Sequence, residues 1–597
     1  HLTINPTLNT LNATSTVAFT GASAQTIPAA TYGNLTVSTT GGNATAGGAI
    51  VANTSLTISS GSTFDLAANT LTGTTLATSG TGALKTQSTS GTPIPFNKTW
   101  SFDVDYNGTG AQTIIPGIYN NLLLTNARTG SPTITLGNGT IAVGGAFTVT
   151  ATGIGSFSLT NSVVDFTSAS SQTIPAISYR NINNSGNGPR VLPNGTVKIL
   201  NSFSPGGGNY TIGTSTVDFN GTGFSPTIPL LPVASGPNYY NMVISGNQTW
   251  TLGGTMTVGG DFSQTTGILQ VNFNTNAART FTVQGNFSLS GGQVDLLVNT
   301  NTSASATVIV NGSTTTSGAS SIRMEPNNNT AGIAIFQTTD FATTSTSTAI
   351  IDFGVGANST GNEFRISGNF SKSGNGAFYT TGSSAATGFV FNKSGVQTFS
   401  YTGAASDYTQ YVVNSGSTLQ MLTGLAIGSA TSAPASKFTL NGILDMGTNV
   451  ISGGTATTNP TVVTISAGST MITANANGVS GSITTLGTKT YDSAANYELS
   501  GSVAMTNTNF VNATMNNLTI SNTSGVTQGG AITVNGNLTI ASGSALTTGA
   551  NAIGLKGNWI NNGGTLTTSN TVTLNGTSVQ SYTNTGTNIF NNLTLNN

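Results

Sequence analysis

Very short alternating runs of apolar and hydroxyl residues recur along the whole chain and constrain its fold more than any other feature. Examples are Leu56-Thr57-Ile58, Phe147-Thr148-Val149 and Leu538-Thr539-Ile540. Each run is closed by Gly, Asn or Ser, which is typical of a strand that ends in a tight turn. Helix-forming charged residues are scarce, because only 5% of the chain is charged. The pattern therefore predicts an all-β protein built from strands of about three to five residues.

These runs belong to a longer repeat block. One copy contains Val164-Asp165-Phe166, then Gln172-Thr173-Ile174-Pro175, then Tyr179. Further copies lie at 18–37, 104–122 and 217–244, and weaker ones at 391–399 and 574–595. A second motif follows most blocks and reads apolar-Thr-apolar, a Gly-containing turn, then Phe or Leu and another apolar residue, as in 532–540.

The repeat predicts a right-handed parallel β-helix, or β-solenoid, with about 18–20 residues per coil and on the order of 30 coils. Uneven spacing of the anchor aromatics Tyr106, Phe166 and Phe219 excludes propeller blades of fixed length. In such a coil, apolar side chains point inward and Thr and Ser point outward. Gly and Asn are expected to supply left-handed backbone angles at the corners, and the recurring Ile-Pro to end a strand.

We expect residues 1–597 to form one continuous repeat array without a separate catalytic domain. The main rival architecture is a string of immunoglobulin-like sandwiches, which would require domain boundaries about every 100 residues. The sequence contains no linkers at such a period.

Composition separates this chain from several classes of protein. An apolar fraction of 36% is enough for a long core and argues against disorder. The 14 Lys and Arg residues are scattered singly, which argues against a nucleic-acid partner. No stretch approaches the roughly 20 apolar residues of a membrane span. Cysteine is absent, so disulfides and thiolate metal sites are excluded.

Both ends of the sequence resemble interrupted repeats. The chain enters a strand motif at Leu2-Thr3-Ile4 and stops after Leu593-Thr594-Leu595, without an atypical capping repeat at either end. An open strand edge can pair with another chain. We therefore expect a window of a longer chain, or a unit that self-associates head to tail or laterally.

Three of the motifs, at 217–223, 172–175 and 537–540, resemble the repeats of very large secreted proteins of the Bacteroidota. Those proteins are similar to adhesins and to autotransporter passenger β-helices. The resemblance implies export to the surface of a bacterial cell and a role in attachment, and it brings no catalytic residues.

The candidate catalytic and metal-binding residues are few. Asp105, Asp165, Asp218 and Asp352 each follow Val or Ile and precede Phe or Tyr. Because a catalytic residue would occur in one copy only, this recurrence favours a structural role at one repeat position. Asp103 and Asp105, beside Asn107, could form a calcium site, although a solvated pair is the favoured interpretation.

His1 is the sole histidine, so imidazole-based metal sites and catalytic triads are not expected. We predict no catalytic, metal-binding or cofactor-binding residues.

Two kinds of surface could bind a ligand. Exposed tyrosines in a row could stack on sugars, although packing at a coil corner is favoured; the candidates are Tyr32, Tyr119, Tyr179, Tyr239 and Tyr240. Flat Thr-x-Thr arrays can bind ice, and 133–135 and 571–573 fit locally. The sequence thus predicts a structural extracellular fibre, stalk or adhesin segment that is not an enzyme. The alternative is a carbohydrate-binding or ice-binding β-helix surface, with surface glycans as possible partners.

Overall fold

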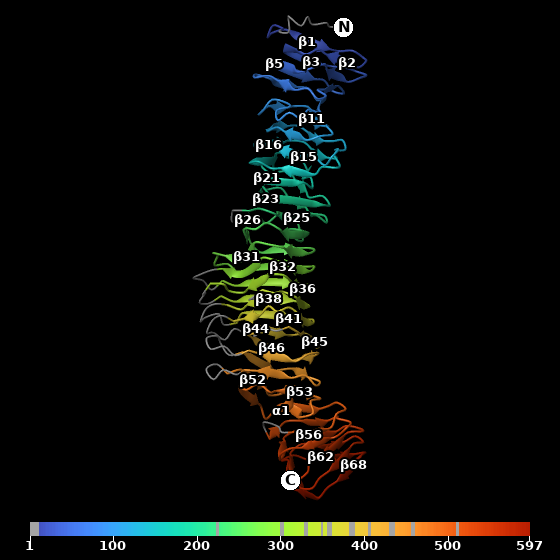
Figure 1. Ribbon diagram of the computed structural model, residues 1–597, viewed down its shortest axis with the longest axis vertical. Helices are drawn as coiled ribbons and strands as arrows, with labels where there is room; N and C mark the ends of the chain where they lie inside the picture. The colour runs from blue at the N-terminus through green and yellow to red at the C-terminus, as the bar shows by residue number, and fades with distance from the viewer. Residues whose placement is uncertain are drawn as a thin grey trace. The chain divides into compact units, whose positions relative to one another are not determined.

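The computed structural model describes residues 11–222, 226–298, 304–327, 332–347, 350–354, 361–380, 388–403, 407–428, 436–454, 460–508 and 513–596. The chain divides into two compact units, residues 1–260 and 261–597. Each unit is a stack of coils whose strands pair in parallel with the strands of the coils before and after (Figure 1). Together the units contain about 24 stacked turns. The predicted β-solenoid is confirmed, and the prediction of one continuous array stays a prediction.

In the first unit the strands form several parallel sheets. The longest series contains β10 (Thr99–Trp100), β13 (Gly117–Tyr119), β16 (Gly139–Val143), β19 (Ser162–Phe166), β21 (Ser178–Asn183), β23 (Thr196–Ser204), β25 (Thr216–Phe219) and β27 (Asn241–Ile244). A second contains β2 (Gln25–Ile27), β4 (Ala44–Ala46), β6 (Thr63–Asp65), β9 (Ala83–Thr86), β11 (Asp103–Tyr106), β14 (Leu122–Leu124) and β17 (Phe147–Val149).

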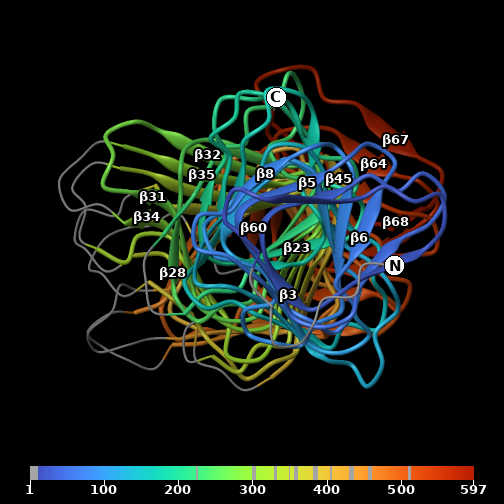
Figure 2. The ribbon, with the colours of Figure 1, turned by 90° about the horizontal axis from the view of Figure 1, so that it is seen from above.

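Smaller sheets complete the coils of this unit. They are β1 (Thr16–Phe19), β3 (Ala30–Val37), β5 (Ile50–Ile58), β7 (Leu71–Thr72) and β8 (Ala77–Ser79); β12 (Gln112–Ile114), β15 (Thr133–Leu136) and β18 (Ser156–Ser158); and β20 (Gln172–Thr173), β22 (Arg190–Val191) and β24 (Tyr210–Thr211). The unit also contains β26 (Thr227–Ile228), β28 (Thr249–Leu252) and β29 (Met256–Val258). Figure 2 shows the strands from above, with β3 and β5, which pair in one sheet, and β6, which belongs to another.

The second unit has the same parallel architecture. Its longest series contains β30 (Phe262–Gln264), β33 (Phe287–Leu289), β36 (Thr314–Thr316), β39 (Phe341–Thr343), β42 (Phe370–Lys372), β45 (Gly395–Tyr401), β47 (Ser417–Met421), β50 (Ile443–Asp445), β53 (Thr470–Thr473), β55 (Asn496–Leu499), β58 (Leu518–Ile520), β61 (Leu538–Ile540), β64 (Trp559–Asn561) and β67 (Tyr582–Asn584).

Other sheets flank this series. They are β32 (Arg279–Val283), β35 (Ala306–Val310), β38 (Ala334–Thr338), β41 (Glu363–Ile366), β44 (Gly388–Phe391), β46 (Gln410–Val413), β49 (Lys437–Leu440), β52 (Val462–Ile465) and β54 (Thr488–Tyr491); β31 (Ile268–Phe273), β34 (Gln293–Val298), β37 (Ser321–Arg323), β40 (Ile351–Asp352) and β43 (Phe378–Tyr379); and β48 (Leu425–Ile427) with β51 (Ile451–Gly453).

The last coils use two further sheets. They are β56 (Met505–Thr508), β59 (Val526–Gln528), β62 (Ala545–Thr547), β65 (Thr565–Thr567) and β68 (Thr587–Ile589); and β57 (Thr514–Met515), β60 (Ile532–Val534), β63 (Ile553–Leu555), β66 (Thr571–Leu574) and β69 (Asn592–Leu595). One short helix, α1 (Gly478–Ser482), occurs in the described part of the chain. Among the described residues, no helix has the length and apolar character needed to cross a membrane.

The coils are longer in part of the second unit than the sequence repeat predicts. Equivalent positions are 18 residues apart between Asp103 and Asn121 and 20 apart between Asn517 and Asn537. Between Asn286 and Ser313 the distance is 27 residues, and from Asn369 to Thr398 it is 29. The expected 18–20 residues per coil therefore hold only for part of the chain, and there are fewer coils than the roughly 30 expected.

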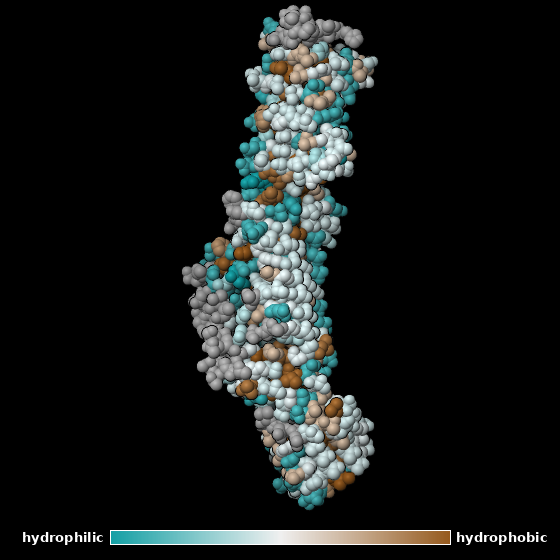
Figure 3. All heavy atoms as spheres, viewed as in Figure 1, coloured by the Kyte–Doolittle hydropathy of each residue, from teal (hydrophilic) through white to brown (hydrophobic). Residues whose placement is uncertain are grey.

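Phenylalanines stack inside the long coils. Phe341 pairs in register with Phe370, and Phe370 with Phe399. The rings of Phe370 and Phe399 are 4.7 Å apart with an interplanar angle of 6°, and all three side chains are buried. Buried, stacked aromatic side chains therefore fill the interior of these coils. On the outside, pale surface of intermediate hydropathy predominates in the face shown in Figure 3, with brown apolar residues in scattered patches.

The Gly-Asn pair of the second motif has a role that differs from the expected one. Asn517 Oδ1 accepts a 2.7 Å hydrogen bond from the backbone N–H of Asn537, and Asn537 Oδ1 accepts a 2.9 Å bond from that of Asn558. A Cβ on Gly536 would overlap Asn517 Oδ1, so the asparagine amide would have to shift from the position in which it accepts this bond. Gly536 therefore makes room for the asparagine of the preceding coil, whereas left-handed backbone occurs at other corners, such as Gly543 and Asn126.

Candidate functional site

Four of the five candidate tyrosines are buried at coil corners. Tyr32, Tyr119, Tyr179 and Tyr239 are at most 1% exposed, and only Tyr240 is half-buried. The hydroxyl groups of the four buried tyrosines donate to backbone carbonyls of the preceding Ile-Pro segment. The bonds are Tyr32 to Pro28 (2.7 Å), Tyr119 to Ile115 (2.5 Å), Tyr179 to Pro175 (2.9 Å) and Tyr239 to Pro229 (2.6 Å). The favoured corner interpretation is confirmed for these four, and none of them is available to stack on a sugar.

The glutamine of the same block bonds to the backbone of its own coil and of the preceding coil. Gln112 Oε1 accepts from the N–H of Gly108 at 2.9 Å, and its Nε2 donates to the carbonyl of Thr86 one coil earlier at 2.8 Å. The same arrangement recurs at Gln172 and Gln580. This role was not predicted from the sequence, although the glutamine recurs in each of these repeat blocks, four residues after the N–H that it accepts from.

Two buried arginines each lie one coil after an anchor aromatic residue and donate to the backbone carbonyl of that residue. Arg128 Nη2 donates to the Tyr106 carbonyl at 2.8 Å, and Arg190 Nη2 donates to the Phe166 carbonyl at the same distance. Burial lowers the pKa of both guanidinium groups. The Nη2 atoms thus bond to backbone carbonyls and not to a carboxylate, so the positions of acidic residues in the sequence give no sign of these contacts.

The recurring aspartates bond to hydroxyl groups one coil further along the chain. Thr125 Oγ1 donates to Asp105 at 2.7 Å, Ser185 Oγ to Asp165 at 2.9 Å, and Ser245 Oγ to Asp218 at 2.5 Å. Burial raises the pKa of Asp105, while the Thr125 bonds lower it. These contacts support the structural interpretation.

The aspartates do not share one coil position, however. Asp105 lies on β11, Asp165 and Asp218 lie in the longest series of the first unit, and Asp352 lies on β40 in another sheet. Asp352 is in register with Arg323, whose guanidinium group makes two bonds of 2.7 and 2.8 Å to buried Asp295. The block is therefore a local corner unit that can occur on different sides of the solenoid.

The two carboxylates of the candidate calcium pair accept hydrogen bonds from different partners. Asn121 Nδ2 donates to Asp103 Oδ1 at 2.7 Å, while Asp105 accepts from Thr125. Asn107 donates nothing to either carboxylate in the observed bonds, and its carbonyl accepts from Asn126. Across the described ranges, no group of three or more His, Asp or Glu residues is placed to hold a metal ion. His1 lies outside the described residues.

The Thr-x-Thr triplets do not extend into a regular array. The strand with 133–135 pairs with Gln112–Ile114 and Ser156–Ser158, and the strand with 571–573 pairs with Ile553–Leu555 and Asn592–Leu595. None of these neighbouring strands is Thr-x-Thr. The arrangement gives the ice-binding interpretation no support.

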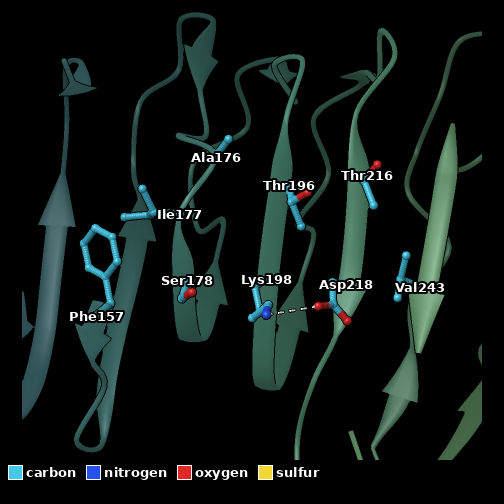
Figure 4. A pocket seen from close by; sticks show the side chains of 9 residues that line it. All are labelled: Phe157, Ala176, Ile177, Ser178, Thr196, Lys198, Thr216, Asp218 and Val243. Atoms are coloured by element: carbon cyan, nitrogen blue, oxygen red, sulfur yellow. Dashed lines mark ion pairs between the residues drawn. The ribbon is translucent and has the colours of Figure 1, made fainter. Parts of the chain in front are cut away.

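A shallow groove of about 520 Å³ lies on the outside of the first unit (Figure 4). Ser178, Lys198 and Asp218 lie on three successive strands of its floor, and the half-buried ring of Phe157 lies at one side. Lys198 Nζ is 3.4 Å from Asp218 Oδ2. The groove thus offers one aromatic face, an ion pair and hydroxyl groups within one surface, a combination that was not predicted from the sequence.

A second cluster of polar groups lies inside the second unit. Lys372 and Asp407 have no exposed side-chain surface, and Nζ is 4.0 Å from Oδ2. Tyr401 OH accepts a 3.0 Å bond from Lys372 Nζ and donates to Asp407 Oδ2. Tyr411 OH donates to the same oxygen at 3.3 Å. Burial lowers the pKa of Lys372 and raises that of Asp407, in each case against the weaker effect of the partner's charge.

No protein-family model, no curated protein and no solved structure matches this chain. The resemblance to repeats of Bacteroidota surface proteins therefore rests on the sequence motifs alone and stays a prediction.

Proposed function

We propose that this chain is a structural segment of an extracellular fibre or stalk of a bacterial surface protein, with a role in attachment and no enzymatic activity. The observation that carries the proposal is the use of the recurring polar residues. The repeated Asp, Gln, Tyr and Asn side chains bond within a corner or to the neighbouring coil. A repeat whose polar groups hold its own coils together is suited to bearing load and spacing other domains.

Self-association belongs to the same proposal. A coil accepts another coil by parallel strand pairing, and the sheet edge does not distinguish a coil of the same chain from one of a second molecule.

Immunoelectron microscopy of the source cells, with antibodies to this segment, tests the proposal. Labelling of surface fibres on intact cells is the expected result. Labelling that requires permeabilised cells would contradict an extracellular role. Sedimentation of the purified chain at increasing concentration tests self-association, and a single monomeric species at all concentrations would count against it.

A second candidate function is carbohydrate binding in the groove around Lys198. Sugars bind proteins by stacking on an aromatic face with hydrogen bonds from nearby polar groups. Phe157, Ser178 and the Lys198–Asp218 pair present that combination. Screening the chain against a panel of oligosaccharides, with Phe157→Ala as the variant and Tyr240→Ala as the control, tests it. Binding that persists in Phe157→Ala would exclude this groove.

A further inference from the structure

The Lys372–Asp407 cluster differs from the other three ion pairs within the described ranges. In those pairs the basic side chain is 36–39% exposed, and its nitrogen is 2.6–3.4 Å from the carboxylate oxygen. Lys372 and Asp407 are fully buried, yet their charged atoms are further apart, at 4.0 Å. A buried ion pair offsets the loss of hydration only when its geometry is close and its hydrogen bonds are complete. The geometry is therefore poor for a pair held together by charge alone.

Burial favours the neutral forms of both groups, against the attraction of two ring faces for the charged amine. Lys372 Nζ lies 4.2 Å from the ring centroid of Tyr401 and 5.4 Å from that of Phe378. Desolvation is the largest influence on both groups, lowering the pKa of the amine and raising that of the carboxyl. A neutral amine is a nucleophile, and a protonated carboxyl is an acyl group with water as its leaving group.

The hydrogen bonds to Asp407 are arranged as acyl transfer requires. The backbone N–H of Phe378 donates to Oδ1 at 2.9 Å, where negative charge would develop in a tetrahedral intermediate. The hydroxyl groups of Tyr401 and Tyr411 both bond to Oδ2, the oxygen that would leave. Tyr401 OH also bonds to Lys372 Nζ, so it connects the amine with the leaving oxygen.

We propose that Lys372 and Asp407 form an intramolecular isopeptide bond. The Nζ lone pair attacks Cγ of the protonated Asp407 carboxyl, and Oδ1 takes up the negative charge. A proton from Nζ passes through the Tyr401 hydroxyl to Oδ2. The Cγ–Oδ2 bond then breaks, one water leaves, and an amide joins Nζ to Cγ. Amine and carboxylic acid give amide and water, so no oxidant, reductant or cofactor is needed.

The bond would join residues of neighbouring coils in the second unit. Lys372 ends β42, whose register partner in the next coil is Tyr401 on β45, and Asp407 follows β45 in the sequence. The cross-link would therefore tie two coils covalently in a chain without cysteine, as a disulfide does in other secreted proteins.

Mass spectrometry of the folded, full-length chain tests the proposal. The intact mass is expected to be lower than the sequence mass by one water. Because acylated lysine resists trypsin, digestion should yield one cross-linked peptide pair that contains Lys372 and Asp407. An intact mass equal to the sequence mass, or a loss of water that maps to other residues, would overturn the proposal.

The molecule contains a matched internal control. The Lys198–Asp218 pair is closer, at 3.4 Å, but its lysine side chain is 39% exposed. Peptides with these two residues should be unlinked, whereas a cross-link there would indicate adventitious dehydration.

Variants separate the reacting groups from the positioning group. Lys372→Arg and Asp407→Ala should each restore the sequence mass, with circular dichroism to confirm that the β fold is kept. Tyr401→Phe keeps the ring and removes the proton path, so the cross-linked fraction should rise more slowly after synthesis. A Tyr401→Phe chain that is cross-linked as fast as the parent would remove the role of that hydroxyl. Cross-linking that persists in Lys372→Arg would overturn the assignment.

Discussion

At the scale of single residues, a side-chain amide of the preceding coil accepts a backbone N–H bond from the second motif in several coils. Asn517 accepts from the N–H of Asn537, and Gly536 leaves the space that this contact needs. Asn517→Ala leaves a backbone N–H without its partner, which costs about 1–3 kcal/mol. We expect hydrogen exchange at the Asn537 amide to be faster than in the parent chain, by the factor that corresponds to this loss of free energy. Asn562→Ala, at an exposed asparagine, is the control and should leave that rate unchanged.

The buried tyrosines make the stability of the first unit sensitive to high pH. Burial raises the pKa of Tyr32 and Tyr106 to about 12 in the folded chain, whereas an unfolded tyrosine has a pKa of about 10. The unfolded state therefore releases its protons first as the pH rises. The contribution of these groups to the free energy of unfolding should be complete below about pH 10 and be lost progressively between about pH 10 and 12.

Chemical unfolding across this pH range measures the effect. The Tyr32→Phe variant, which has no ionisable hydroxyl, should show a shallower decline than the parent chain. Equal slopes for the two chains would show that Tyr32 makes no such contribution.

At the scale of the element, the corner built on Gln112 combines three contacts. Its side chain bonds to the Gly108 N–H, to the Thr86 carbonyl and to the buried Arg128 guanidinium at 2.7 Å. Gln112→Ala leaves these groups unsatisfied in the interior, and we expect a loss of about 2–4 kcal/mol in the free energy of unfolding. Gln420→Ala, at a half-buried strand position, is the control and should lose less than about 1 kcal/mol. Urea unfolding followed by circular dichroism measures both, and equal losses would contradict the corner account.

The sequence was sufficient to predict the elements but not their contacts. Alternation in runs such as Leu538-Thr539-Ile540 predicts a strand with Thr outward, because side chains on a strand alternate between faces. The repeat of Gln-Thr-Ile-Pro and Tyr179 predicts a corner. The longer coils between Asn286 and Thr398 were not predictable, because the extra residues carry no repeat motif of their own. The Lys372–Asp407 cluster was also missed, since only the stacking of coils brings together residues that lie in different motifs.

At the scale of the whole molecule, stability comes from repeated contacts between neighbouring coils. In such quasi-one-dimensional proteins each repeat contacts mainly the adjacent ones. Three kinds of contact join one coil to the next: bonds from hydroxyl groups to Asp, bonds from backbone N–H groups to Asn side chains, and stacked phenylalanine rings. The proposed structural role rests on these contacts between successive coils.

Electron cryomicroscopy of the native material tests the central claim most directly. If the protein is a structural β-solenoid that stacks coil on coil, images and their diffraction should show fibres with a repeat of ~4.8 Å along the axis. Fibre density should continue through this segment without a break in the stacking. Separate globular particles without the ~4.8 Å repeat would contradict the account.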